Sequence, residues 1–315
     1  MVMGPVDVID HLIVRQGCQR EVISLFRTHY EPLAAERGLK FGKMVLLPPF
    51  DRPESEAEII ITWQYPTLGQ LWMARGVEES DPRIAAFWST LETLVVRRSR
   101  RLGRDAMLDE MGPRDDGFSL GAGGPRRGIA FVEPLGAPEA ALAALSTLGL
   151  RGGINRGAYT FRPEELTVEF DGEAVPDLAT TGTVAEAVIL SPIAFGKRTP
   201  QLTGGVKRTI LLRTMADATE DQVRGMEQQL VEYARHLPEM VNFGLSHVVR
   251  STGETRWTHC YEQEFRDVAD VTGAYLDHPA HWAVVDRLFH PEAPERAADA
   301  FFHSIYAVDR SVLAR

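Results

Sequence analysis

The 315-residue chain has very little cysteine: Cys18 and Cys260 are its only two. Two thiols are too few for a disulfide framework or a four-thiolate zinc site, which indicates a reducing compartment. The sequence also lacks a run of about 18 apolar residues, the length that a membrane-spanning helix needs. Its amino terminus has no basic stretch followed by an apolar one, as a secretory signal would. We therefore expect a cytoplasmic protein without a membrane partner.

An excess of basic charge is also absent. The chain has 44 acidic and 34 basic side chains, for a formal net charge of −10. A general nucleic-acid surface needs a positive field to offset the phosphates, so a nucleic-acid partner is not expected. A hydrophobic fraction of 44% and a charged fraction of 25% are ordinary for globular proteins. The length suffices for two or three domains.

The first 110 residues show the pattern of a small α+β domain. Apolar and β-branched residues predict strands at 6–15, 41–47 and 58–64. Periodic apolar positions and capping signals predict helices from Gln19, from Thr67, and from Pro82 to about Arg98. The order βαββα is that of a ferredoxin-like sandwich whose closing strand is uncertain.

Two stretches rich in glycine and proline divide the rest of the chain. Residues 111–127 contain Gly-Ala-Gly-Gly-Pro at 121–125, which follows no clear strand and leads into two arginines instead of a helix. The stretch is therefore interpreted as a linker rather than a phosphate loop. Residues 128–200 predict a degenerate ferredoxin-like or connecting domain, in which Val175–Thr183 is all that remains of a second helix. Its expected elements are strands at 128–133, 158–162, 166–170 and 185–190 and a helix at 138–148. A second linker covers residues 199–205.

Residues 204–315 repeat the βαββαβ order more clearly. A capping box at Thr219 and Gln222 opens one helix. Two further helical stretches are expected at about 268–276 and 279–289, and strands at 207–215, 243–249, 256–265 and 302–308. The fold class is therefore α+β, with tandem ferredoxin-like domains.

Candidate chemistry gathers in this last domain. Strand alternation places Trp257, His259, Tyr261 and Phe265 on the face that helices should cover, and Cys260 on the other. The segment Tyr275-Leu-Asp-His278-Pro-Ala-His281 follows, with His281 in the first turn of a helix. An imidazole can accept a proton near neutral pH, and a tyrosine hydroxyl can orient it or stabilise an enolate. His278 precedes a proline, which favours a helix-capping role.

Tyr275-x-x-His278-Pro-x-His281, preceded by Trp257-Thr-His259, resembles the signature of the stress-responsive A/B-barrel (Dabb) family over about 110 residues. The resemblance implies ferredoxin-like units whose sheets pair into a dimeric α+β barrel. It also implies cofactor-free enzymes, since a polyketide cyclase and a plant hydroxynitrile lyase are members. In the cyclase, the positions of Tyr275 and His281 form the catalytic pair and that of His259 lines the pocket. The cyclase has a histidine in its first strand, where this chain reads Lys-Arg-Thr-Ile-Leu at 207–211.

The expected function is thus that of a lyase or cyclase acting on a polyketide-like, phenolic or related carbonyl substrate, with His281, Tyr275 and His259 as catalytic residues. Trp257, Tyr261, Trp282 and His278 are predicted to bind substrate, and no metal or other cofactor is expected. Two alternatives stay open. One is a haem-dependent or oxygen-handling enzyme with an axial ligand such as His303. The other is a non-catalytic stress protein that holds a ligand without converting it.

The first domain resembles NIPSNAP and EthD-type barrels more loosely. When its elements are aligned with those of the last domain, Ile59 stands at the position of His259. In the same alignment, Asp81-Pro-Arg-Ile84 stands at the position of His278–His281. It lacks the predicted catalytic residues and is interpreted as a structural partner. We expect barrel pairing either within the chain, between the first and last domains, or in a homodimer.

Overall fold

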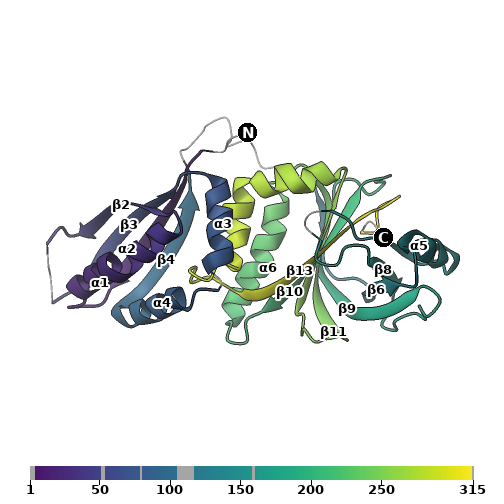
Figure 1. Ribbon diagram of the computed structural model, residues 1–315, viewed down its shortest axis with the longest axis horizontal. Helices are drawn as coiled ribbons and strands as arrows, with labels where there is room; N and C mark the ends of the chain where they lie inside the picture. The colour runs from purple at the N-terminus through teal and green to yellow at the C-terminus, as the bar shows by residue number, and fades with distance from the viewer. Residues whose placement is uncertain (1–3, 51–53, 79, 105–116, 158–159, 314–315) are drawn as a thin grey trace. The chain divides into compact units, whose positions relative to one another are not determined.

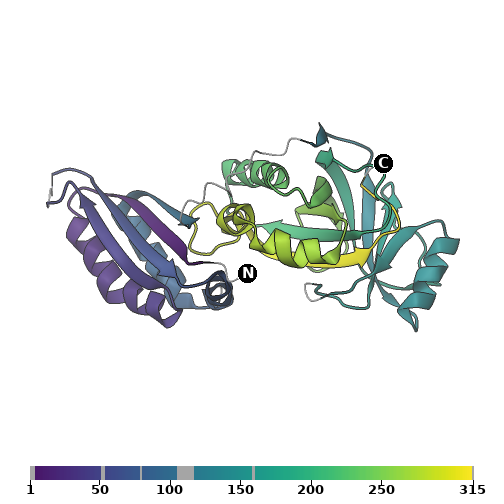
Figure 2. The same cartoon turned by 90° about the horizontal axis from the view of Figure 1, so that it is seen from above.

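The computed structural model describes residues 4–50, 54–78, 80–104, 117–157 and 160–313 (Figures 1 and 2). The chain divides into two compact units. Unit 1 comprises residues 1–112 and 282–296, and unit 2 comprises residues 113–281 and 297–315. This division differs from the predicted domains, because residues 282–296 pack with the first unit rather than the last. No helix among the described residues is long and apolar enough to cross a membrane.

Unit 1 contains a four-stranded antiparallel sheet of order β2-β3-β1-β4. Its elements are β1 (Val6–Val14), α1 (Gln19–Leu25), η1 (Phe26–Tyr30), α2 (Glu31–Glu36), β2 (Lys40–Leu47), β3 (Ala57–Tyr65), α3 (Leu68–Glu78), α4 (Pro82–Leu94) and β4 (Val95–Gly103). The alternation in β1 and β3 buries one face of the sheet against the helices, as Figure 1 shows for α1 and α2. The helix predicted to reach Arg98 ends at Leu94. The closing strand starts there because Val95 and Val96 favour extended backbone.

The segment 282–296 completes the interior of unit 1. Trp282 is buried in the core cluster of this unit. Farther along, the Glu292 carboxylate accepts hydrogen bonds from the hydroxyl of Tyr30 (2.8 Å) and the indole N–H of Trp88 (3.0 Å), and it forms an ion pair with Arg100. Arg100 also pairs with buried Asp10 of β1 (Nε to Oδ1, 2.7 Å). Buried charges therefore link this segment to the sheet and helices of unit 1.

Unit 2 contains a nine-stranded antiparallel sheet of order β13-β10-β12-β11-β9-β6-β8-β7, with β5 added on β9. Its elements are β5 (Ser119–Gly121), β6 (Arg127–Pro134), α5 (Pro138–Thr147), β7 (Arg151–Ile154), β8 (Leu166–Asp171), β9 (Gly182–Lys197), β10 (Val206–Thr214), α6 (Glu220–Ala234), β11 (Met240–Ser251), β12 (His259–Phe265), η3 (Asp270–Tyr275) and β13 (Ala298–Ala307). The helical turns η4 (His281–Val285) and η5 (Asp286–Leu288) connect the units in sequence.

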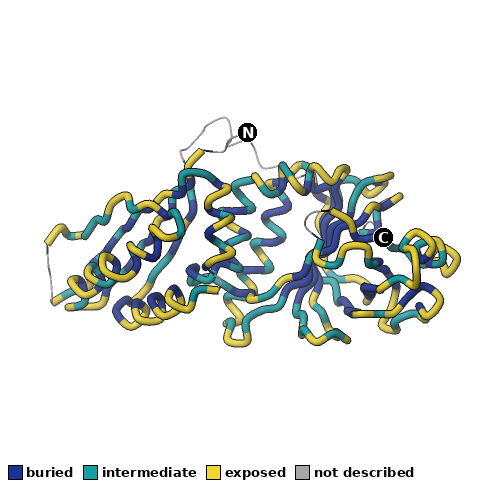
Figure 3. The backbone as a smooth tube through the Cα atoms, in the orientation of Figure 1, coloured by how far each residue is buried: buried dark blue, intermediate teal, exposed yellow. Residues whose placement is uncertain are grey.

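The sheet of unit 2 curls until its edges meet. The backbone N–H of Arg156, just after β7, donates to the carbonyl of Ile305 in β13 (2.9 Å). Helices α6 and α5 lie on opposite sides of the curled sheet (Figure 1), whose strands are largely buried (Figure 3). This confirms the α+β, tandem ferredoxin-like barrel class. The barrel partner of the last domain is the middle segment, however, and the prediction that the first domain closes it is wrong. The long strand β9 pairs with β11 and joins the two half-barrels.

Several local predictions for the middle segment also differ from the structure. A strand forms at 151–154 rather than at 158–162, of which residues 158–159 lie outside the described part. Residues 175–183 form no helix. The predicted linker at 111–127 includes the short strand β5, while its first residues lie outside the described part. The interior of the barrel holds ion pairs between buried Lys207 and two buried glutamates, Glu169 and Glu262.

Candidate functional site

The helix-covered face of β10, β12 and β13 carries most of the predicted site. Strand alternation sends Lys207, Cys260 and Glu262 into the barrel and sends their neighbours toward α6 and η3. The hydroxyl of Tyr261 donates to the carbonyl of Leu230 in α6 (3.0 Å), which fixes the orientation of this face. As predicted, Tyr261 and Cys260 therefore lie on opposite faces of β12.

Tyr275 and His281 meet beside this face. Their rings lie 4.6 Å apart between centroids, at an interplanar angle of 49°. Tyr275 ends η3, is buried, and also touches the rings of Tyr233 (5.4 Å) and Phe265 (5.9 Å). His281 is only partly buried. The aromatic walls hold the tyrosine in place while the imidazole keeps some access to solvent.

A buried arginine completes the group, and sequence reasoning did not identify it. The guanidinium carbon of Arg208 in β10 lies 4.6 Å from the centroid of the Tyr275 ring. Its nitrogens contact the Gln263 carbonyl oxygen (3.3 Å) and the His303 ring (Nδ1, 3.1 Å). Within the described residues these partners are all uncharged or weakly basic, and the Nε of Arg208 has no hydrogen-bond partner. A buried cation without a carboxylate partner is costly, so this position favours an anionic ligand or intermediate.

The electrostatics of the neighbouring groups follow from burial. The pKa of His303 is held well below its usual range, first by burial and then by the positive charge of Arg208. His303 is therefore neutral at physiological pH and can accept a hydrogen bond from the guanidinium. Burial, together with the nearby Tyr275, raises the pKa of Tyr233 well above its usual value. Arg208 thus carries the fixed positive charge among these groups.

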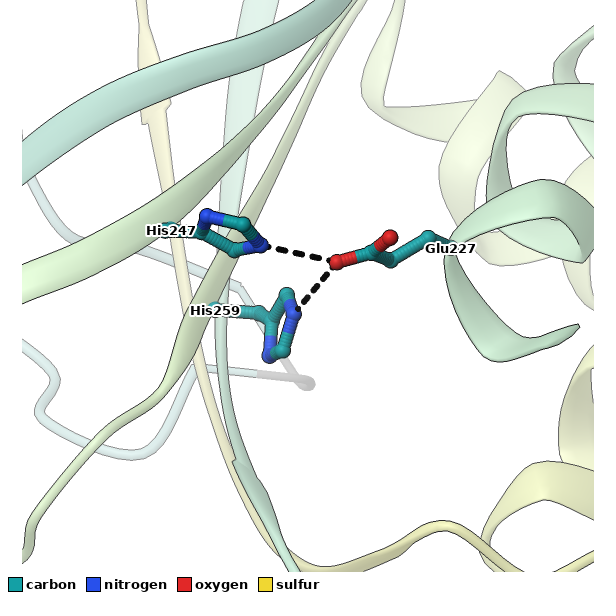
Figure 4. A group of neighbouring side chains, drawn as sticks. All are labelled: Glu227, His247 and His259. Carbon is teal, nitrogen blue, oxygen red and sulfur yellow. Dashed lines mark hydrogen bonds and ion pairs between the residues drawn. The ribbon is translucent and has the colours of Figure 1, made fainter. Parts of the chain in front are cut away.

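His259 lies in a different group from Tyr275 and His281. Its Nε2 contacts Oε1 of Glu227 in α6 at 3.1 Å, and Nε2 of His247 in β11 contacts the same oxygen at 2.8 Å (Figure 4). Arg208, which touches Tyr275, is paired with Gln263, four residues along β12 from His259. The structure therefore brings two of the three predicted catalytic residues together and places the third with partners that the sequence did not single out.

Of the predicted substrate-binding residues, Tyr261 has its side chain between the sheet and α6. Trp257 packs beside Cys260 and Phe302, and its indole N–H donates to Glu186 (2.7 Å). Because β12 begins only at His259, the alternation of side chains along this strand does not determine the orientation of Trp257. Trp282 belongs to the core of unit 1.

His278 has the capping geometry that its place before Pro279 favours. Its Nδ1 accepts the backbone N–H of Ala280 (3.1 Å), and its carbonyl accepts that of His281 (2.9 Å). These bonds begin the turn that carries His281, so His278 orients the helix start. A direct role in substrate binding stays a prediction.

Comparison with protein-family models shows that residues 206–302 match the Stress responsive A/B Barrel Domain, Dabb. This confirms the resemblance inferred from Tyr275, His278 and His281, and the match includes Arg208 and Gln263, while His303 follows directly after it. Comparison with curated proteins gives no match.

Solved structures similar to parts of the chain include three of different kinds. A NIPSNAP family protein from Agrobacterium tumefaciens is 20% identical, with 33% of this chain and 95% of that chain covered and a TM-score of 0.26. Hydroxynitrile lyase from Passiflora edulis is 20% identical, covering 34% and 94%, with a TM-score of 0.28. A major regulator of staphylococcal pathogenesis is 11% identical, covering 57% and 97%, with a TM-score of 0.36. At these TM-scores the similarities carry no argument about function.

Proposed function

We propose that unit 2 is an enzyme of small-molecule metabolism, a lyase or cyclase, that moves a proton on a carbonyl substrate at His281. The observation that carries the proposal is the buried guanidinium of Arg208, without a carboxylate partner among the described residues, beside the Tyr275–His281 pair. A cation fixed in a dry environment stabilises a developing oxyanion strongly. The Dabb match over residues 206–302 supports a working site in the same region.

In the proposed reaction, His281 acts as the general base. It takes a proton from the carbon next to a carbonyl, and the electron pair of that C–H bond forms an enolate whose oxygen is held by Arg208 and the Tyr275 hydroxyl. The enolate carbon then attacks a second carbonyl of the same substrate, which closes a ring, and the imidazolium returns its proton to the new alkoxide. The reverse type of step cleaves a carbon–carbon bond in the same geometry.

The aromatic surroundings suit such a substrate. Tyr233 and Phe265 flank Tyr275, so a planar phenolic or polyketide-like compound would find ring surfaces on which to stack. A conjugated enolate or phenolate spreads its negative charge over several atoms, which matches the broad, planar guanidinium of Arg208. Side chains alone supply the proton transfer and the charge stabilisation in this proposal.

The test measures kcat/KM on linear poly-β-keto thioesters and aromatic cyanohydrins for wild type and three variants, His281→Ala, Tyr275→Phe and Arg208→Met. We expect each variant to lose about 10²- to 10⁴-fold in rate. Arg213→Met is the matched control, since Arg213 lies on the same strand but is exposed and pairs with Asp299. Turnover that survives His281→Ala and Tyr275→Phe unchanged would refute the assignment.

The alternative of a non-catalytic binding protein gives a different result in a second assay. Wild type is titrated with 4-nitrophenol, whose absorbance reports its ionisation. Arg208 should favour the bound phenolate, and Arg208→Met should remove that shift. Saturable binding that depends on Arg208, without turnover of any carbonyl substrate, would favour the binding protein over the enzyme.

A further inference from the structure

A second cluster of side chains in unit 2 is independent of the Tyr275–His281 group. It consists of Glu227, His247 and His259, which come from a helix and two neighbouring strands (Figure 4). His247 and His259 face each other across the antiparallel pair β11–β12. Their rings are 5.1 Å apart and nearly perpendicular, and both Nε2 atoms point at the carboxylate of Glu227.

The donor atoms already lie close to the positions that a metal ion would require. The His247 Nε2, the His259 Nε2 and a Glu227 oxygen are all within 4.8 Å of one another. Zinc binds such donors at about 2.0–2.2 Å, so two tetrahedral donors stand roughly 3.4 Å apart. The observed separations from Glu227 Oε1 are 2.8 and 3.1 Å. The two separations from Glu227 therefore have to lengthen by roughly 0.3 and 0.6 Å to admit an ion.

The hydrogen-bond partner of His259 suits a ligand imidazole. Its Nδ1 lies 2.9 Å from the hydroxyl oxygen of Thr258, which lies 3.1 Å from the carbonyl of Leu212. If Thr258 donates to Nδ1, then Nε2–H donates to Glu227. If Thr258 donates to Leu212, then Nδ1–H donates to Thr258 and the lone pair of Nε2 is free for a cation. The first arrangement suits the contact without a cation. The second places two acceptors 3.1 Å apart, which a cation between them would bridge, and its Nδ1–H bond is the outer-shell bond typical of metal-bound histidine.

The cluster can be reached from solvent. The side chain of His247 is 48% exposed and that of Glu227 is 24% exposed, whereas His259 is buried at 5%. Glu227 also lines a shallow groove of about 380 Å³ whose other walls include Ile193, Val231 and Leu245. One buried and two accessible ligands anchor an ion on one side and leave coordination positions on the other.

Another cluster of the same residue types shows why this one is favoured. In unit 1, Glu78, His290 and Glu292 also lie close together. There Arg37 pairs with both glutamates and Arg100 with Glu292, so arginines already neutralise the carboxylates. Among the described residues, Glu227 has its ion-pair contacts with the two histidines. A divalent ion would be repelled in unit 1 and attracted in unit 2.

The geometry points to a divalent transition-metal site formed by Glu227, His247 and His259, with coordination positions open to solvent. Two imidazoles and one carboxylate fit Zn²⁺ and also Fe²⁺, Mn²⁺ or Co²⁺ when further positions are left to water or substrate. No metal was expected from the sequence, in which Glu227, His247 and His259 are far apart and show no short ligand spacing. The site stands apart from the proposed acid–base function and does not depend on it.

Binding is tested on the full chain after treatment with EDTA and dialysis. Co²⁺ is titrated while its visible absorption is recorded, and Zn²⁺ is then added to displace it. We expect one Co²⁺ per chain, with loss of saturable binding in His247→Ala and Glu227→Gln. Thr258→Val should weaken binding by about 10- to 100-fold, because it removes the outer-shell partner of His259.

The matched control is His236→Ala. His236 is an exposed histidine next to Glu232 (3.8 Å) just after α6, so it reports adventitious binding to a surface His–Glu pair. Circular dichroism verifies that each variant is folded. Absence of a Co²⁺ band, or a band equally strong in wild type, His247→Ala and Glu227→Gln, would overturn the proposal. If His236→Ala loses as much Co²⁺ binding as His247→Ala and Glu227→Gln do, the bound metal is an adventitious ion only.

Discussion

Removing the carboxylate of Glu292 should destabilise unit 1 strongly. This side chain is 1% exposed and is held by Arg100, Arg37, the Tyr30 hydroxyl and the Trp88 indole. In Glu292→Ala, the guanidinium of Arg100 keeps Asp10 as its only carboxylate partner among the described residues. Breaking a buried ion pair by deleting one member costs about 3–5 kcal/mol. The lost hydrogen bonds belong to the same network and are not added separately.

Tryptophan fluorescence during urea unfolding suits the measurement. Four of the five tryptophans, Trp63, Trp72, Trp88 and Trp282, belong to unit 1. The emission change therefore reports mainly on that unit. A loss of 3–5 kcal/mol is a large fraction of the roughly 5–15 kcal/mol by which domains are stable, so the unfolding midpoint should fall far below that of wild type.

The control lies three residues farther along the same segment. Glu295 pairs with Arg101 and Arg287 and is 31% exposed. Because exposed ion pairs contribute little, Glu295→Ala should cost at most about 1 kcal/mol. If Glu292→Ala and Glu295→Ala have the same midpoint within error, the buried carboxylate does not stabilise unit 1 and the reasoning fails.

Three further predictions concern both units. Burial raises the pKa of Glu78 from 4.5 to about 7, so its contribution to stability is complete below pH 4.5 and is lost as the pH rises through 7. The free energy of unfolding of wild type minus that of Glu78→Gln, measured in urea, should therefore be about 2–3 kcal/mol larger at pH 5 than at pH 8. An equal difference at both pH values would contradict this. Lys207→Met leaves two glutamates in the barrel without their ammonium partner and should lower the free energy of unfolding of unit 2 by about 3–5 kcal/mol, measured by circular dichroism. Gly153→Ala would bring a Cβ within 2.5 Å of the Tyr306 ring at the seam of the barrel and should cost about 1–3 kcal/mol, whereas no loss would mean that the seam can open freely.

The sequence was sufficient for features that depend on local pattern. The capping box at Thr219 and Gln222 forms as expected. The alternation in β12 correctly separates Tyr261 from Cys260, because that strand has one face toward helices and one toward the barrel. The spacing of Tyr275 and His281 likewise brings the two rings together across the connection between η3 and η4.

The sequence was insufficient where residues far apart must meet. Arg208 becomes notable only when the structure shows that no carboxylate partner reaches it among the described residues. His247 pairs with His259 through strand register, and Glu227 reaches both from a helix. Pairing of β9 with β11 joins two half-barrels whose relation no local pattern encodes. The hairpin of residues 240–265 could have indicated the histidine pair, because its strand register places His247 opposite His259.

The discontinuity of unit 1 has a consequence for how the chain is made. During synthesis, residue 112 leaves the ribosome long before residues 282–296, which belong to the same unit. At a translation rate of roughly 5–20 residues per second, the intervening residues take about 10–40 s. For that time the nascent first unit holds Arg100 and Arg37 without the Glu292 carboxylate. A ribosome-bound fragment that stops before residue 282 should therefore be more sensitive to protease in its first 112 residues than one that extends past 296.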